Sequence, residues 1–351
     1  MVKSFYSVLG IMSGTSLDGV DLAHITLSYN GKWHYNFLNC ETIAYPADWL
    51  KKLKNLVGLS KDELDKLDGE YTQYLATVIN TFIDRHKITD LDFISSHGHT
   101  ALHQPNAGIT VQIGNKQSLA SLTQQTVICD FRVQDVLLGG QGAPLVPIGD
   151  KLLFSEYDYC LNLGGFANLS TEINGQRIAY DVCPVNIVLN HYVTSLGLDY
   201  DNAGKIAASG QVHKVLLKEL NNIDFYQKTH PKSLGLEWVK TQIFPVIDAF
   251  DLSTADILRT VVQHVAIQVG SQIKMGKTLI TGGGVYNLFL MAEIKKLTKA
   301  VITIPNAQLI EYKEALIFSL LGALKKRNEV NCLATVTGAK TDHSSGEIYH
   351  P

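Results

Sequence analysis

The chain has 351 residues, of which 46% are hydrophobic and 18% are charged, and its formal net charge is −3. This length and composition are typical of a globular protein of about two domains. A net charge this small provides no basic surface for nucleic acid or an anionic membrane, and no apolar stretch is long enough to span a bilayer. The five cysteines lie far apart without a C-x-x-C pair, so we expect reduced thiols in a cytoplasmic protein without an export signal.

The first predicted elements are two strands, residues 4–8 and 20–28, joined by a turn of small residues. The turn carries polar side chains that suit a phosphate group, namely Ser13, Thr15, Ser16 and Asp18. Gly14 and Gly19 would let backbone N–H groups converge there. An ordinary Gly/Ser hairpin is the alternative interpretation. The turn is not a Walker loop, because no Gly-Lys-Ser/Thr sequence and no helix follow it.

A strand over residues 33–44 and helices over 47–57 and 60–86 are predicted next. Ser60 and Glu63 have the spacing of a capping box at the start of the second helix. An apolar stripe at helical spacing then follows. The stripe consists of Leu64, Leu67, Tyr71, Leu75, Val78, Phe82 and Ile83. A strand over 92–96 comes next, and we expect residues 96–100 (SHGHT) to break it.

The opening pattern recurs in the second half of the chain. Strands over 111–113 and 127–131 enclose a helix at about 116–124, and the glycine-rich residues 139–144 lie near the expected domain boundary. The predicted order is then a strand (157–163), a turn at Gly164 and Gly165, a strand (167–173), a turn at Asn174 and Gly175, and a strand (177–180). This recurrence predicts duplicated domains that face each other across a cleft.

The rest of the chain also alternates helices and strands, as in the α/β class. We expect helices over 184–196, 253–274, from about 287 onward and over 314–326, and strands over 278–281 and 301–304. Residues 223–240 are interpreted as an insertion. The predicted domains are residues 1–140 and 141–330, followed by a surface tail over 331–351.

Asp181 is the strongest catalytic candidate. A carboxylate between a predicted strand and the start of a predicted helix would face a cleft. An aspartate that caps the helix, worth about 1 kcal/mol, is the alternative. We interpret the neighbouring Cys183 as a small buried side chain, because phosphoryl transfer requires no thiol.

Residues 97–103 contain three histidines. His97 and His99 would share one face of a strand. A structural metal bound together with His103 is one interpretation, although no further ligands at a known spacing accompany them.

Two further positions carry suitable chemistry. The Arg132 guanidinium suits a substrate carboxylate through two parallel hydrogen bonds, and an ion pair with Asp130 or Asp135 is the alternative. Residues 282–284 (GGG), between a predicted strand and helix, would let the backbone approach a flat ligand closely.

Residues 10–21 (GIMSGTSLDGVD) resemble the opening signature of the anhydro-N-acetylmuramic acid kinases, which belong to the superfamily of actin-like ATPases and sugar kinases. Other segments resemble this family, in its own order, from residue 9 to about residue 320. They are residues 96–100 (SHGHT), 130–132 (DFR), 139–147 (GGQGAPLVP), 161–168 (LNLGGFAN), 207–210 (AASG), 231–233 (PKS) and 282–287 (GGGVYN). So many motifs in one order make the resemblance specific.

The resemblance implies an α/β fold of two actin-like (ribonuclease H-like) domains, with ATP and an amino sugar bound in an interdomain cleft. It implies that Asp181 is the catalytic base. The residues implied for ATP and its phosphates are Gly14, Thr15, Ser16, Leu17, Asp18, Gly19, Val20, Asp21, Gly164, Gly165, Gly282, Gly283, Gly284 and Asn287. Those implied for the sugar are His97, His99, Thr100, Arg132, Asn186 and Glu314. Mg²⁺ would arrive with ATP, near Asp18, without a dedicated protein metal site. An exposed helix carboxylate is the alternative for Glu314, and a homodimer stays open.

The chain departs from the family pattern at two places. Val182, Cys183 and Val185 replace the threonine and both glycines that follow the family's aspartate, and His99 stands where the family usually has glutamine. The first departure puts the loop width and a substrate hydrogen bond in doubt, but it leaves the base, Asp181, in place.

The implied reaction is the opening of 1,6-anhydro-N-acetylmuramic acid by water, coupled to phosphorylation of its 6-oxygen by ATP, in cell-wall (murein) recycling. Two other functions stay open. One is a kinase of the same superfamily in which Asp181 deprotonates a free sugar hydroxyl. The other is a non-catalytic protein that binds a nucleotide or a sugar.

Overall fold

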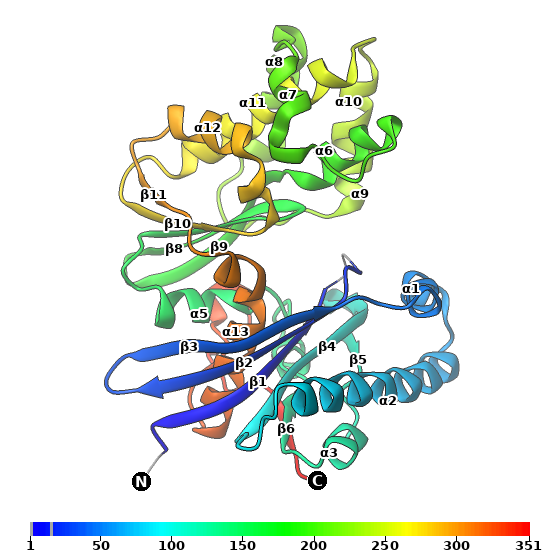
Figure 1. The fold of residues 1–351 in the computed structure, drawn as a ribbon. Coiled ribbons are helices and arrows are strands. Elements are labelled where there is room, and N and C mark those ends of the chain that lie inside the picture. The colour runs from blue at the N-terminus through cyan, green and yellow to red at the C-terminus, as the bar shows by residue number, and fades with distance from the viewer. Residues whose placement is uncertain (1–2, 15–16) are drawn as a thin grey trace. The chain divides into compact units, whose positions relative to one another are not determined.

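The computed structural model describes residues 3–14 and 17–351, which form two compact units (Figure 1). Unit 1 contains the chain up to Leu153 together with Tyr312–Pro351, and unit 2 contains Phe154–Glu311. This division differs from the predicted ranges, 1–140, 141–330 and 331–351. The chain enters unit 2 only after Leu153. It returns to unit 1 at Tyr312, where the backbone of a long helix is interrupted (φ −108°, ψ 15°).

Unit 1 is built on a seven-stranded sheet in the order β12-β6-β4-β1-β2-β3, with β5 paired to β4. The strands are β1 (Phe5–Ser13), β2 (Val20–Tyr29), β3 (Trp33–Ile43), β4 (Phe93–Gln104), β5 (Ile109–Ile113), β6 (Val127–Cys129) and β12 (Glu347–Tyr349). The first three strands are antiparallel, whereas β4 runs parallel to β1, and β6 runs parallel to β4. Residues 9–13, predicted as part of a turn, continue β1 because they pair with β2 on one side and β4 on the other.

Unit 2 repeats this topology in a five-stranded sheet of order β11-β10-β7-β8-β9. Its strands are β7 (Tyr159–Leu163), β8 (Phe166–Ile173), β9 (Gln176–Pro184), β10 (Lys277–Thr281) and β11 (Val301–Thr303). Three antiparallel strands are again followed by two parallel ones. The repeat confirms the predicted duplication and the α/β class, while a cleft between the units stays a prediction.

Helices cover both faces of the unit 1 sheet. They are α1 (Ala47–Lys54), α2 (Lys61–Arg85), α3 (Ser118–Thr123), α4 (Val133–Leu137), α5 (Val146–Leu153), α14 (Ala334–Thr337) and the part of α13 (Ala307–Lys326) that follows Tyr312. The predicted capping box of Ser60 and Glu63 begins α2, and the predicted apolar stripe of α2 packs on the sheet.

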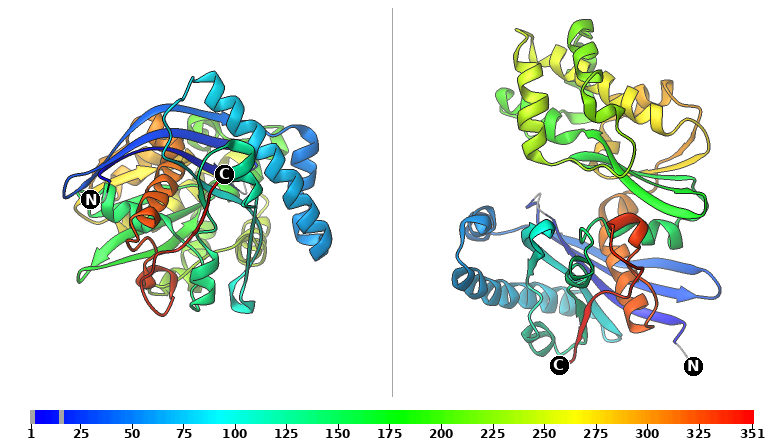
Figure 2. Two further views of the ribbon diagram at one scale, coloured as in Figure 1. Left: turned by 90° about the horizontal axis from the view of Figure 1, so that it is seen from below. Right: turned by 180° about the vertical axis from the view of Figure 1, so that it is seen from behind.

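Alternation of side chains along the strands explains how α2 and α13 lie on opposite faces of this sheet (Figures 1 and 2). Leu9 and Ile11 of β1 pack in the same cluster as the α2 stripe. Gly10 between them faces α13, where an added Cβ would lie 2.3 Å from the Ala315 carbonyl oxygen. A glycine in β1 therefore lets α13 approach the sheet closely.

Unit 2 is mostly helical outside its sheet. Its helices are α6 (Asn186–Val193), α7 (Lys205–Ser209), α8 (Lys214–Asn221), α9 (Leu236–Trp238), α10 (Phe244–Asp248), α11 (Thr254–Gln272) and α12 (Leu288–Lys296). The predicted helix over 253–274 is confirmed as α11, whose apolar side chains lie in the main core of the unit.

Residues 223–240, interpreted as an insertion, contribute buried side chains to unit 2, because Phe225 and Val239 are buried and Val239 lies in the unit 2 core. The prediction that residues 331–351 form a surface tail is wrong. Asn331 and Ser345 are each 1% exposed, and β12 pairs with β6. The polar composition of residues 331–351 predicts an exposed segment, but Asn331 and Ser345 form buried hydrogen bonds.

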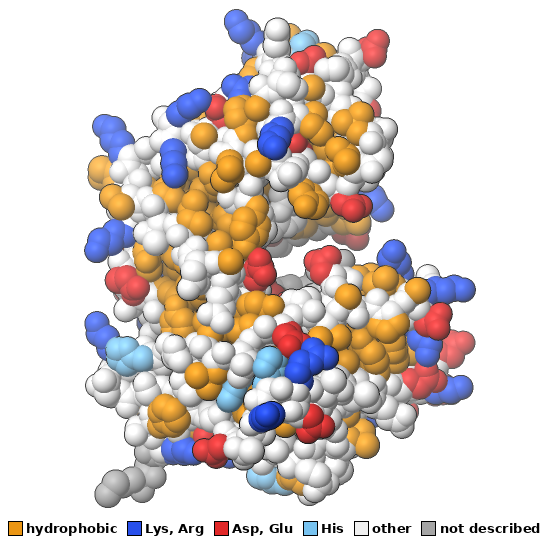
Figure 3. Space-filling view, viewed as in Figure 1, with side chains coloured by type: hydrophobic (Ala, Val, Ile, Leu, Met, Phe, Trp, Pro, Cys, Tyr) orange, Lys and Arg blue, Asp and Glu red, His pale blue; other side chains and the backbone are white. Residues whose placement is uncertain are grey.

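Charged side chains of both signs are interspersed on the face drawn in Figure 3, as expected from the small net charge. None of the helices in the described residues has the length and hydropathy needed to cross a membrane.

Candidate active site

The loop between β1 and β2 carries the first group of predicted ATP-binding residues. Thr15 and Ser16 lie outside the described residues. The Leu17 N–H donates to the Gly14 carbonyl oxygen at 3.2 Å, and the Asp18 carboxylate is exposed. Gly19 is buried against β3, and a Cβ there would lie 2.5 Å from the Ile43 carbonyl oxygen. Packing of the sheet alone therefore requires glycine at position 19, whereas Asp18 is accessible to a ligand.

The two residues after Gly19 belong to β2 and contribute to unit 1 itself. Val20 is fully buried in the core, and the Asp21 carboxylate accepts a hydrogen bond from Thr42 Oγ1 at 2.6 Å. These contacts fix the β2 side of the loop.

His97 and His99 contact different neighbours on the two faces of the sheet. β4 contains a bulge, since Ile11 pairs with Ser96 but Ser13 pairs with His99, and Gly98 has φ 71°. The extra residue reverses the alternation of side chains after His97. The prediction that the two histidines share one face is therefore wrong, and so is the prediction that residues 96–100 end the strand. A metal held jointly by these two rings does not fit this arrangement.

His97 is placed to position Arg132. The Arg132 Nε–H donates to His97 Nε2 at 2.9 Å, and the His97 Nδ1–H donates to the Gly98 carbonyl oxygen at 2.9 Å. The His97 ring is 4% exposed and packs 4.8 Å from the ring of Phe318. Burial and the Arg132 charge hold the pKa of His97 well below its usual range, so the imidazole is neutral. Both ring nitrogens bind protein groups.

The Arg132 guanidinium has a second fixed contact, from Nη1 to the Gly142 carbonyl oxygen at 2.6 Å. Burial lowers the pKa of Arg132 to about 10. Among the contacts of the described residues, Arg132 forms no ion pair with Asp130 or Asp135; Asp130 accepts a hydrogen bond from Asn115, and Asp135 accepts one from the Gly142 N–H. The described hydrogen bonds use Nε and Nη1, so Nη2 is the guanidinium nitrogen left for a ligand.

The remaining predicted sugar-binding residues of unit 1 differ in accessibility. His99 is 2% exposed, and its Nδ1 lies 2.7 Å from the Ser13 hydroxyl, which also contacts Tyr45. Burial lowers the pKa of His99 to about 4. Thr100 is half-buried on β4, whereas Glu314 is exposed on α13 and its charge opposes the fall in the pKa of Arg132.

Asp181 lies within β9, not between a strand and a helix as predicted, because β9 continues to Pro184 and α6 begins only at Asn186. The capping alternative is excluded, since the residue before α6 is Val185. The Asp181 Oδ2 atom accepts a hydrogen bond from the Leu234 N–H at 2.7 Å. Burial raises the pKa of Asp181 to about 6, and this hydrogen bond opposes the rise. The side chain is thus a partly buried carboxylate held by one backbone donor.

Sequence reasoning missed the segment that holds Asp181. The Asp181 N–H donates to the Lys232 carbonyl oxygen at 3.0 Å. Together with the hydrogen bond from Leu234, this contact makes residues 232–234 a partner of both the backbone and the side chain of Asp181. The motif at residues 231–233 was the available signal, but a spatial partner some fifty positions away in the sequence has no local signature. Asp130 was also not singled out, although burial raises its pKa to about 6.

The turn at Gly164 and Gly165 contacts the start of α6. The Gly165 carbonyl oxygen accepts hydrogen bonds from the Val185 and Ile187 N–H groups at 2.8 and 3.2 Å, and the Gly164 carbonyl oxygen accepts one from Asn186 at 3.3 Å. Gly165 is exposed, and a Cβ there would have no heavy atom closer than 3.8 Å. The fold therefore does not itself require glycine at position 165.

The three glycines after β10 have different surroundings. An added Cβ would lie 2.5 Å from Asn162 Oδ1 at Gly282 and 2.8 Å from the Leu163 carbonyl oxygen at Gly284, whereas Gly283 is exposed with nothing within 4 Å. Asn287 caps α12, because its Oδ1 accepts a hydrogen bond from the Leu290 N–H at 2.9 Å. Gly283 is the glycine of the three that leaves open space for a ligand.

Comparison with known proteins identifies the relatives of this chain. A family model described as anhydro-N-acetylmuramic acid kinase matches residues 6–351. Proteins of that name from Pseudomonas syringae pv. syringae (strain B728a), Xylella fastidiosa (strain Temecula1) and Mannheimia succiniciproducens are 32%, 33% and 33% identical to the chain. The matches cover 97%, 98% and 99% of this chain and 98%, 96% and 100% of the relatives. The chain therefore belongs to the anhydro-N-acetylmuramic acid kinase family and is a phosphotransferase.

Proposed function

We propose that this chain is an ATP-dependent kinase that opens 1,6-anhydro-N-acetylmuramic acid with water and phosphorylates its 6-oxygen, giving N-acetylmuramic acid 6-phosphate in murein recycling. The observation that carries the proposal is Asp181, a partly buried carboxylate with a pKa of about 6 in a chain of this family. A base with this pKa is ionised at neutral pH and still basic enough to accept a proton from an attacking water.

Unit 1 supplies the sugar-binding groups in this proposal. The Arg132 guanidinium, held by His97, binds the carboxylate of the substrate through Nη2. Thr100 and Glu314, both accessible to a ligand, bind sugar hydroxyl or amide groups, as does Asn186 of unit 2. His99 is buried, and in this proposal it contributes indirectly through its contact with the Ser13 hydroxyl.

ATP is bound by backbone groups rather than by a lysine-containing phosphate loop. The segment from Gly14 to Asp21 and the turn at Gly164 and Gly165 bind the phosphates, and residues 282–287 bind the adenosine. Mg²⁺ would enter with the nucleotide, and the exposed Asp18 carboxylate would supply an oxygen near it. The requirement for ATP and the reduced thiols support a cytoplasmic location, and a homodimer stays a prediction.

The chemistry balances in one coupled reaction. Asp181 accepts a proton as the water oxygen forms a bond to the anomeric carbon, and the bond from that carbon to the bridging oxygen breaks. The bridging oxygen then bonds to the γ-phosphorus of ATP as the bond to the ADP oxygen breaks. Because the leaving group of one step is the nucleophile of the other, no separate acid is needed at that oxygen. Positioning and charge stabilisation provide most of the catalysis of phosphoryl transfer.

The test follows one oxygen atom. In ¹⁸O-labelled water, the product should carry the label at the anomeric hydroxyl and none in the phosphate ester. The product must be trapped early and compared with unlabelled product incubated in the same water, because reducing sugars exchange this oxygen slowly. Early product with no label above that control would contradict hydrolytic opening and leave phosphorylation of a free hydroxyl as the reaction.

A further inference from the structure

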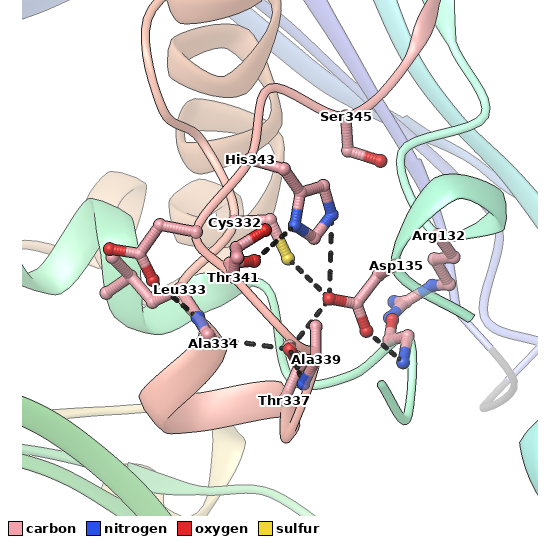
Figure 4. Close-up of polar contacts among 12 residues, drawn as sticks. Arg132, Asp135, Cys332, Leu333, Ala334, Thr337, Ala339, Thr341, His343 and Ser345 are labelled. Atoms are coloured by element: carbon pink, nitrogen blue, oxygen red, sulfur yellow. Dashed lines mark hydrogen bonds and ion pairs between the residues drawn. The ribbon is translucent and has the colours of Figure 1, made fainter. Parts of the chain in front are cut away.

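A second group of reactive side chains lies in unit 1, outside the candidate active site (Figure 4). Asp135, Cys332 and His343 are all buried, and their donor atoms lie within 4.8 Å of one another. Cys332 and His343 come from strand-like segments paired by backbone hydrogen bonds, with each N–H donating to the carbonyl oxygen of the other residue. Asp135 comes from α4. The group therefore joins the end of the chain to the middle of unit 1.

The spacing of the donor atoms suits a tetrahedral cation. The Cys332 Sγ–H donates to Asp135 Oδ1 at 3.1 Å, and His343 Nε2 lies 3.6 Å from the same oxygen. Ligand atoms around zinc are about 3.3–3.8 Å apart, given metal–ligand bonds of about 2.0–2.3 Å. Small side-chain shifts bring these three atoms to that geometry.

The tautomer of His343 is the second, independent observation. His343 Nδ1 lies 3.0 Å from the Thr341 carbonyl oxygen, which can only accept, so Nδ1 carries the proton. In the neutral ring, Nε2 is then unprotonated and carries a lone pair. It has no hydrogen-bond partner although His343 is only 8% exposed, and it faces the Asp135 carboxylate (Figure 4). A lone pair facing an anionic oxygen in a buried site is unfavourable unless a cation or a proton lies between them.

The surroundings resemble the supporting shell of a metal site. Histidine ligands commonly donate their other N–H to a carbonyl oxygen, as His343 does, and ligating carboxylates accept hydrogen bonds of their own. Asp135 Oδ2 accepts one from the Gly142 N–H at 2.7 Å, and Oδ1 accepts one from Thr337 Oγ1 at 2.7 Å. Burial raises the pKa of the Cys332 thiol, so it is a thiol when no cation is bound. A divalent cation would stabilise the thiolate, and its two charges would balance those of the thiolate and the carboxylate.

We propose that Asp135, Cys332 and His343 bind one divalent cation of the zinc type, with a fourth position left for water. A thiolate, an imidazole and a carboxylate together favour zinc over magnesium or calcium. The ion would join the C-terminal segment to α4 and to Gly142, whose carbonyl oxygen holds Arg132. The proposed ion lies outside the candidate active site, and it does not depend on the proposed activity.

The test measures bound zinc in the full-length, untagged chain after expression with zinc and dialysis into metal-free buffer. We expect one zinc ion per chain in the wild type and its loss in Cys332→Ser and in His343→Gln. Cys332→Ser is chosen because its hydroxyl keeps the hydrogen bond to Asp135, so the fold is retained. Cys160→Ser, a change at a buried cysteine of unit 2, is the matched control and should keep the zinc.

Cobalt provides a readout specific to the thiolate. The Co²⁺-loaded wild type and Cys160→Ser should show a thiolate-to-cobalt charge-transfer absorption that Cys332→Ser lacks, and zinc should raise the Tm of the wild type but not of His343→Gln. Equal zinc content in the wild type and both site variants would overturn the proposal. So would nuclear magnetic resonance showing both His343 ring nitrogens protonated at neutral pH, since a proton would then take the place of the cation.

Discussion

At the scale of single residues, Asp181 shows how environment distinguishes a reactive carboxylate from a structural one. The N–H donor and the dipole at a helix N-terminus lower the pKa of an aspartate that caps the helix, whereas burial raises the pKa of Asp181 to about 6 and one N–H opposes this rise. Its neighbours in sequence do not explain this, because Val182 and Cys183 are simply buried in the core. The environment is made by residues 232–234, which come from elsewhere in the chain.

Asp181→Asn should therefore abolish most activity while stabilising the protein. Turnover should fall about 10²–10⁴-fold, the usual contribution of a general base. Because the folded-state pKa is raised from 3.8 to about 6, the wild type binds an extra proton when folded and loses stability as pH rises through this window. Above pH 6 the ionised carboxylate lowers the free energy of unfolding by about 1–2 kcal/mol. This is less than the pKa shift alone would give, because the side chain is partly exposed. Asparagine keeps the acceptor for Leu234 without this cost.

Thermal unfolding of both proteins between pH 4 and pH 8 provides the measurement. The variant should have the higher Tm at pH 8, and the difference in Tm between the two proteins should disappear by pH 4. The wild-type turnover number should rise with pH up to about 6 and then level off. A variant that is less stable than the wild type at pH 8 would show that the carboxylate is not desolvated.

Arg132→Lys tests the sugar-binding role at the same scale. Lysine cannot replace both the Nε contact to His97 and the Nη1 contact to Gly142, so the head group loses its fixed position. We expect the KM for the anhydro sugar to rise about 10–100-fold, the loss of a charge-assisted hydrogen bond, while the KM for ATP is unchanged. A substrate analogue without the carboxylate should be used equally well by both proteins. If the KM of the variant rose as much for that analogue as for the anhydro sugar, Arg132 would not bind the substrate carboxylate.

At the scale of elements, identical residues in one motif have different roles. Residues 282–284 read as a uniform glycine run, yet Gly284 is required by contact with Leu163 of β7 and Gly283 contacts nothing within 4 Å. Similarly, the bulge in β4 places His97 and His99 against different helices although only Gly98 separates them in the sequence. Packing of neighbouring elements decides both cases.

Gly284→Ala should therefore lower the free energy of unfolding, whereas Gly283→Ala should not. Gly284→Ala should destabilise the protein by about 1–3 kcal/mol, because the new methyl group would lie 2.8 Å from Leu163 atoms. Gly283→Ala should leave the free energy of unfolding unchanged or slightly raised. If adenosine lies against Gly283, the same change should raise the KM for ATP without affecting the KM for the sugar. Urea denaturation and steady-state kinetics measure these effects. An unaltered KM for ATP in Gly283→Ala would show that adenosine does not lie against Gly283.

At the scale of the whole molecule, the chain builds unit 1, then unit 2, and then returns to complete unit 1. The returning segment contributes α13 to one face of the sheet and β12 to its edge. Its position is fixed by Asn331, which is 1% exposed. Asn331 Nδ2 donates to the carbonyl oxygens of Leu321 and Ser345, and its Oδ1 accepts from the Ser345 N–H.

Asn331→Ala should destabilise unit 1 by at least about 2 kcal/mol, because it leaves buried carbonyl and N–H groups without partners. Lys340→Ala, at an exposed position of the same segment, is the control and should change stability by less than about 0.5 kcal/mol. Chemical denaturation of both variants gives the comparison. Equal stability of the two would mean that this segment does not hold unit 1 together.

The sequence by itself determined the order and type of most elements, the duplicated α/β plan and the family. These depend on local signals, such as the apolar stripe of α2, its capping box and the turn at Asn174 and Gly175, and on motifs that are contiguous in the chain. Only the tertiary structure decided the surroundings of Asp181, the position of Arg132 and the burial of residues 331–351. Each depends on pairing between segments far apart in the sequence, where the free energy of burial and of satisfied hydrogen bonds overrides local composition.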